Sequence, residues 1–165
     1  MKMFLFPILA FFLFFSTTGG FAMIVTMSLD DLVINSDLIA IGKLEKSTEG
    51  TGQTGGFKNM TNLLSLSEVI KGEEKKMKDV SVDTLADFED EAKLPSDGIF
   101  MIFLKKGNEG KFLPTNGIQS CWPISDEKLF GMGHGYTIDQ IRETVKKNKG
   151  KKPAPQSNTP PQPEF

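Results

Sequence analysis

Two side chains in this sequence could together perform nucleophilic chemistry, Cys121 and His134. A thiolate–imidazole dyad requires the two groups to touch, and the glycine-rich stretch GMGHG around His134 is flexible enough to allow that contact. However, no third group in recognisable spacing would orient the imidazole, and no local signature of a thiol enzyme is present. A buried Cys121 acting as a small apolar side chain, and a His134 in an exposed loop, explain both residues more simply. We therefore expect a protein without enzymatic activity, and keep a small thiol hydrolase as an alternative.

Candidate metal ligands are equally few. A zinc site needs three or four N, S or O ligands, and the chain offers one His, one Cys and scattered carboxylates. The acidic segment DFEDEAKLPSD (residues 87–97) contains five carboxylates, but the spacing of a calcium-binding EF-hand loop is missing. We predict a solvated connection at this segment, with no metal site and no cofactor.

A glycine-rich stretch offers the best candidate for recognition. Residues 47–58, STEGTGQTGGFK, contain four glycines and no core-forming run, which predicts a flexible loop. The order GxxxxGK[ST] of a phosphate-binding loop is absent. Because binding concentrates in loops that a rigid scaffold carries, we take Phe57 and Lys58 as candidate binding residues. Trp122 is a third candidate, as an anchor of either the core or the rim.

Charge is divided unevenly along the chain. Residues 23–145 carry 13 Lys and Arg against 20 Asp and Glu, a net charge of −7, whereas residues 146–165 carry five Lys against one Glu, a net charge of +4. An acidic body argues against nucleic-acid binding, which needs a basic surface to face the phosphates. The tail 149–165 is rich in Lys and Pro and predicts a disordered extension. It either solubilises the protein or tethers it to an anionic surface.

The N-terminus, MKMFLFPILAFFLFFSTTGGFAM, has the features of an export signal. Lys2 precedes an apolar run at residues 3–15, and Gly20 and Ala22 place small side chains before a cleavage point. The apolar run is too short for a comfortable membrane span. We predict a signal peptide at residues 1–22 and a secreted or periplasmic mature protein that is not an integral membrane protein.

Most of the remaining chain predicts strands. Ser28 and Asp31 would cap a short helix that ends near residue 37, and Thr137 with Gln140 would cap a helix that Gly150 ends. The pattern of apolar residues predicts strands at residues 38–46, 64–71, 79–85, 98–107 and 111–124. The strand at 98–107 is apolar on both faces and should therefore be central.

Two irregularities indicate that the predicted sheet is curved. Gly42 lies inside a strand, where glycine marks a sharp bend or a close approach of two backbones. The period-2 pattern slips near Ser67–Glu68, which predicts a β-bulge. The lone Cys121 excludes an intrachain disulfide, so packing alone must hold the domain together, and we expect a monomer. The predicted core is Leu38, Ile41, Leu64, Leu66, Val80, Val82, Met101, Phe103 and Trp122.

These elements predict a mainly β domain at residues 23–148. It would be a small, five-stranded, partly open barrel of the oligonucleotide/oligosaccharide-binding (OB) type, with a short N-terminal helix and a closing C-terminal helix. The succession of NSDLIAIGKLEKS, TNLLSLSEVIKGEEKKMKDVSVDTL and GIFMIFLKKGNEGKFLPTNGIQSCWPI resembles netrin-like domains. These include the tissue inhibitors of metalloproteinases and exported bacterial domains. The resemblance covers residues 28–124.

The resemblance implies the fold without the inhibitory function. Metalloproteinase inhibitors of this type bind the catalytic zinc through an N-terminal Cys-x-Cys segment, whereas this chain would begin MIVTMSL and has its single cysteine at position 121. We expect an exported, non-enzymatic binding or accessory module of the cell envelope. It would recognise a protein or glycan partner through the barrel rim and the 47–58 loop. A structural envelope protein tethered by its basic tail is the other alternative.

Overall fold

The computed structural model describes residues 25–73 and 77–153. The predicted signal peptide lies outside these residues, as does the tail beyond residue 153. In the described part of the chain the elements are α1 (Leu29–Asn35), β1 (Leu38–Thr54), β2 (Phe57–Lys71), β3 (Asp79–Leu85), β4 (Ile99–Lys106), β5 (Phe112–Pro114), β6 (Cys121–Ser125), β7 (Lys128–Leu129) and α2 (Ile138–Lys147). Two short 3-10 turns are η1 (Gly117–Ser120) and η2 (Gly131–Gly133).

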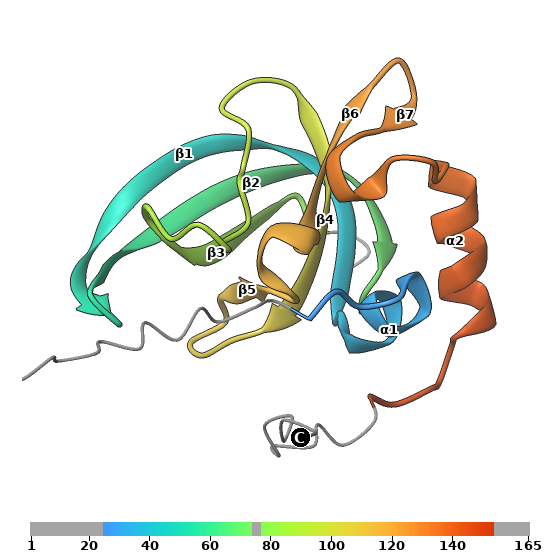
Figure 1. Cartoon of the computed structure of the whole chain (residues 1–165), viewed down its shortest axis with the longest axis horizontal. Coiled ribbons are helices and arrows are strands. Elements are labelled where there is room, and N and C mark those ends of the chain that lie inside the picture. The colour runs from blue at the N-terminus through green and yellow to red at the C-terminus, as the bar shows by residue number, and fades with distance from the viewer. Residues whose placement is uncertain (1–24, 74–76, 154–165) are drawn as a thin grey trace, which may run out of the picture.

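The strands form a single sheet that is partly closed on itself. Their order is β1-β2-β3-β5-β4-β6-β7, and an additional pairing of β1 with β4 closes the first five into a ring. The predicted mainly β fold with a five-stranded ring and two helices is thus confirmed. The predicted final strand at 111–124 is divided in two, because η1 separates β5 within the ring from β6 outside it. Figure 1 shows α1 and α2 next to each other at one end of the sheet, with the long β1–β2 hairpin extending away from them.

Strand β4 is central because both of its faces are covered. Phe100, Ile102 and Leu104 contribute to a cluster inside the ring, whereas Met101 and Phe103 contribute to a second cluster with the two helices. All five side chains have no exposed surface. This explains why the sequence is apolar at every position here. Of the predicted core residues, Leu66 is the one that is only partly buried.

The prediction of a flexible loop at residues 47–58 is wrong. Strand β1 continues to Thr54 and β2 begins at Phe57, so the stretch is the end of a long β-hairpin. Gly55 and Gly56 both have positive φ angles, 59° and 86°, which suits a two-residue hairpin turn. The sequence misleads because this half of β1 is mostly exposed, so no apolar alternation marks it as a strand.

The two predicted irregularities are confirmed and lie side by side. Ile41 pairs with Glu68 and Gly42 pairs with Leu66, which leaves Ser67 as a bulge. A Cβ atom on Gly42 would lie 2.4 Å from the backbone oxygen of Ser65. Pairing between β1 and β4 ends at Gly42. The close approach therefore marks the point where β1 separates from β4 and continues in its pairing with β2.

Lys71, the last residue of β2, stabilises the end of helix α1. Helix α1 begins at its N-cap Ser28, whose side chain accepts a hydrogen bond from the Asp31 backbone N–H (3.1 Å). At the other end, Lys71 Nζ donates to the carbonyl oxygens of Val33 (2.7 Å) and Ile34 (3.3 Å), and to that of Ser36. A cation at a helix C-terminus satisfies its free carbonyls and complements its dipole.

Replacing Lys71 by Met should lower the free energy of unfolding by about 1–2 kcal/mol, because three partly buried carbonyl oxygens lose a charged donor. Urea unfolding measures the change. Lys43→Met is the matched control, since Lys43 is exposed and its ion pair with Glu45 (2.9 Å) lies on the surface; its cost should stay below about 0.5 kcal/mol. Equal losses in the two variants would exclude the capping role.

Helix α2 is fastened to the sheet and to α1. Its predicted capping box between Thr137 and Gln140 is confirmed. Arg142 binds the Glu68 carboxylate of β2 through Nε (3.0 Å) and Nη2 (2.7 Å). These hydrogen bonds raise the pKa of the guanidinium above its ordinary value. No helix in the described residues is long and apolar enough to span a membrane.

Candidate functional site

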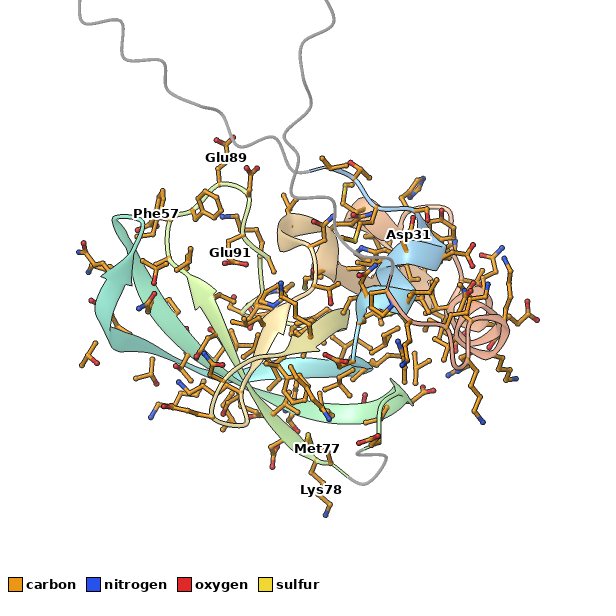
Figure 2. All side chains as sticks on the ribbon, turned by 90° about the horizontal axis from the view of Figure 1, so that it is seen from below. Asp31, Phe57, Met77, Lys78, Glu89 and Glu91 are labelled. Carbon is orange, nitrogen blue, oxygen red and sulfur yellow. The ribbon has the colours of Figure 1, made fainter. Side chains whose placement is uncertain are left out.

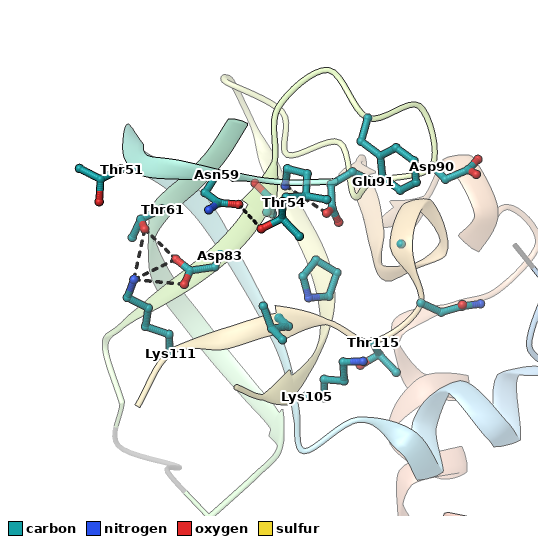
Figure 3. A pocket seen from close by; sticks show the side chains of 18 residues that line it. Thr51, Thr54, Asn59, Thr61, Asp83, Asp90, Glu91, Lys105, Lys111 and Thr115 are labelled. Carbon is teal, nitrogen blue, oxygen red and sulfur yellow. Dashed lines mark hydrogen bonds and ion pairs between the residues drawn. The ribbon is translucent and has the colours of Figure 1, made fainter. Parts of the chain in front are cut away.

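The ring of strands is held together weakly at one seam. Strands β3 and β5 run parallel and pair at a single position, Val82 with Phe112. Beyond this pair, Asp83 and Leu85 on β3 and Leu113 on β5 line a cleft with a volume of 760 Å³. The cleft is therefore the opening of the barrel (Figure 3). Its two edges are formed by the end of β3 and by β5.

The β1–β2 hairpin and the acidic connection form the walls of this cleft. The hairpin contributes Thr51, Thr54, Asn59 and Thr61, and the connection between β3 and β4 contributes Phe88, Asp90 and Glu91. Figure 2 shows Phe57 on the same side of the molecule as Glu89 and Glu91, with Met77 and Lys78 at the opposite end of β3. The rings of Phe57 and Phe88, 4.9 Å apart, join the two walls at the rim.

A polar triad spans the strands of the cleft. Lys111 Nζ lies 3.1 Å from Asp83 Oδ2, and Thr61 Oγ1 donates to Asp83 Oδ1 over 2.6 Å. In Figure 3 the three side chains point toward one another from β2, β3 and the turn before β5. Both charged side chains are about one-third exposed, at 36 % for Lys111 and 34 % for Asp83. The triad is thus already assembled and reachable from solvent.

Glu91 fixes the acidic connection to the sheet. Its carboxylate accepts hydrogen bonds from the backbone N–H groups of Leu85 (3.1 Å) and Ala92 (3.0 Å). Residues 87–97 form a connection without strands or helices, as predicted. They are less solvated than expected, because Ala92 is buried and Glu91 is partly buried. Among the residues that the structure describes, no three His, Cys, Asp or Glu side chains gather closely enough to hold a metal ion.

No protein-family model matches this chain. No curated protein matches it in sequence at a significant level. Function is therefore inferred from the chemistry of the cleft.

The three candidate binding residues lie in different places. Phe57 packs on Phe88 at the rim, and Lys58 is exposed beside it in an ion pair with Glu49 (3.1 Å). Trp122 is only 1 % exposed, and its Nε1 donates to the Gln119 carbonyl oxygen (2.7 Å). Trp122 is therefore an anchor of the core and offers no surface to a partner.

The sequence reasoning missed the triad of Thr61, Asp83 and Lys111. The outward-facing polar side chains of β2 and β3 were a weak signal, since Thr61 and Asp83 are directly opposite in the register of those strands. Lys111 could not be placed beside them, because it reaches them only through the parallel pairing of β3 with β5.

The two residues of the candidate thiol dyad, Cys121 and His134, lie in different environments. Cys121 is 6 % exposed, packs inside the ring, and has its pKa raised to about 12 by burial. His134 is exposed at the end of η2. Among the hydrogen bonds of the residues that the structure describes, none joins these two side chains. A thiol that is buried and protonated is also a poor nucleophile.

Alkylation should distinguish this thiol from a reactive one. At pH 8 the rise of the pKa from 9.0 to about 12 lowers the thiolate fraction about a thousandfold. Iodoacetamide should therefore modify Cys121 at least a hundredfold more slowly in the native protein than in guanidinium chloride, as measured by mass spectrometry. Similar rates in both states would mean that the thiol is accessible and ionised.

Proposed function

We propose that this protein is an exported, non-enzymatic binding module of the cell envelope that holds its ligand in the cleft at the opening of the barrel. The observation that supports this most is the assembled polar triad of Thr61, Asp83 and Lys111 at the point where β3 and β5 separate. Such a site is ready to bind without rearrangement, which avoids the cost of ordering side chains on association.

The proposed fold is an OB barrel of netrin-like type. The closed order β1-β2-β3-β5-β4 supports it, together with the parallel pairing of β3 and β5. OB barrels bind ligands on the face of their second and third strands and with the loops that join strands 1 to 2 and 4 to 5. Here the cleft takes residues from the β1–β2 hairpin, from β3, and from Lys111 in the connection of β4 to β5. The netrin-like relationship is proposed for the fold alone.

Nucleic acid is a poor candidate for the ligand. Proteins that bind single strands combine a positively charged groove with exposed aromatic rings on which bases stack. The cleft instead brings Asp83, Asp90 and Glu91 together with Lys105 and Lys111, within a body that carries an excess of carboxylates. A protein or a glycan of the envelope is the proposed partner.

Retention of envelope material on the immobilised protein tests this function. Leu113 lines the cleft and is 37 % exposed, so Leu113→Arg places a large charged group in it. Leu63→Arg is the matched control, because Leu63 is 40 % exposed on β2 and does not line the cleft. We expect the Leu63 variant to retain the same component as the unmodified protein, and the Leu113 variant to retain at least tenfold less.

Equal retention by both variants would contradict the proposed site. A form that ends at Asn148 tests the tethered structural role in the same assay, since the basic tail is the feature that suggests it. Loss of retention in this truncated form at low and high salt, with no effect of Leu113→Arg, would favour the structural role over the binding module.

A further inference from the structure

Most of the charged side chains that line the cleft already interact with other groups in or beside it. Asp83 is paired with Lys111, and the Glu91 carboxylate accepts from two backbone N–H groups. The two remaining charged side chains in the lining, Lys105 and Asp90, have opposite signs. Three carboxylates and two lysines give the lining a net charge of −1, so an anionic ligand would meet an excess of its own sign. With most of these charges already engaged, the cleft suits an uncharged ligand better than an anionic one.

The opening between β3 and β5 does not suit an added peptide strand. A peptide that extends a sheet pairs its backbone with alternating free N–H and C=O groups of the edge. On β3 the N–H of Leu85 is already bound by Glu91, at 3.1 Å. On β5 Pro114 has no N–H to offer. Both edges of the opening therefore lack a backbone donor where a strand would need one.

Neutral polar side chains dominate the rest of the lining. Hydroxyl and amide groups both donate and accept hydrogen bonds, which matches a ligand that carries many hydroxyl groups. The side chains of this kind in the cleft are Thr51, Thr54, Asn59, Thr61, Thr84, Thr115 and Asn116.

Apolar surface lies beside these polar groups. Leu85, Phe88, Leu113 and Pro114 also line the cleft and offer surface for the C–H faces of sugar rings. A volume of 760 Å³ falls within the range of roughly 300–1,000 Å³ typical of ligand-binding pockets.

We infer that the cleft binds an uncharged oligosaccharide, with the carboxylate of Asp83 as its central acceptor. This inference rests on the binding function proposed above. Asp83 Oδ1 accepts from Thr61 (2.6 Å) and Lys111 (3.3 Å), whereas Oδ2 is contacted by Lys111 (3.1 Å) and keeps a lone pair for a sugar hydroxyl. Thr61 and Lys111 act as positioning residues, because they hold the carboxylate in place.

Calorimetric titration with defined sugars tests the inference. The probes are uncharged tetrasaccharides of glucose, mannose, galactose and N-acetylglucosamine, with an anionic hyaluronan tetrasaccharide for comparison. We expect at least one uncharged probe to bind, and Asp83→Asn to weaken it about 10- to 100-fold, the effect of losing a hydrogen bond to a charged acceptor. Asp79→Asn, on the same strand but outside the cleft, should leave binding unchanged.

Each other outcome overturns a defined part of the account. Tighter binding of hyaluronan than of every uncharged probe would overturn the inference of an uncharged ligand. If no sugar binds while Leu113→Arg still abolishes retention of an envelope protein, the oligosaccharide inference fails and the binding function stands. If no sugar binds and Leu113→Arg changes nothing, both fail. Equal weakening by Asp79→Asn and Asp83→Asn would also reject Asp83 as the acceptor.

Discussion

Replacing Phe103 by Ala should lower the free energy of unfolding by about 3–5 kcal/mol, the range for truncating a buried aromatic ring. Phe103 has no exposed surface, and its ring centroid lies 4.6 Å from that of Trp122. Since natural domains are stable by about 5–15 kcal/mol in total, this variant should be close to unfolding at physiological temperature. Urea unfolding followed by Trp122 fluorescence measures the loss.

Phe130→Ala is the control for this prediction. Phe130 is 42 % exposed, so its truncation should cost less than about 1 kcal/mol. A loss below about 1 kcal/mol for Phe103→Ala would mean that the second core cluster is not formed as described.

The lone Cys121 leaves the core dependent on packing, and a reducing agent should therefore not change the melting temperature.

Replacing Gly42 by Ala should cost about 3 kcal/mol, the upper end of the range for overpacking, because the obstructing atom is backbone and cannot rotate away. The new Cβ would lie 2.4 Å from the Ser65 carbonyl oxygen. Thermal or urea unfolding measures the change in stability.

Gly50→Ala provides a matched substitution on the same strand. Its Cβ would lie 3.3 Å from the Asn59 carbonyl oxygen, so a shift of a few tenths of an ångström relieves the contact. We expect its effect to stay below about 1 kcal/mol. Losses of the same size at Gly42 and Gly50 would show that β1 and β2 do not approach each other closely at the bulge.

The parts of the fold that bury apolar residues could be predicted from sequence. Strand β4 is apolar at consecutive positions because both of its faces are covered, and the bulge at Ser67 is visible as a slip in the alternation. The helix caps at Ser28 and Thr137 follow from local hydrogen bonding between near neighbours. These features depend on short-range patterns or on strong burial, which leave clear marks in a sequence.

The end of the β1–β2 hairpin and the cleft beside it could not be predicted in the same way. The hairpin end is paired through its backbone, so its polar side chains carry no alternation that would indicate a strand. The triad joins Thr61, Asp83 and Lys111 through one parallel contact between β3 and β5, which no local pattern encodes. For Trp122 the sequence left the core and the rim open as alternatives, and its burial places it in the core.

A chemical-shift map of the isotope-labelled protein, titrated with the envelope component that it retains, tests the central claim most directly. If the ligand occupies the opening of the barrel, the largest shifts should be those of the backbone amides of Asp83, Leu85 and Leu113, which line it. The amide of Asp79, the first residue of β3, should not move, and neither should that of Lys78, which Figure 2 shows at the same end of the strand. Shifts that are confined to this end of β3, or to the helices, would contradict the assignment of the cleft as the binding site.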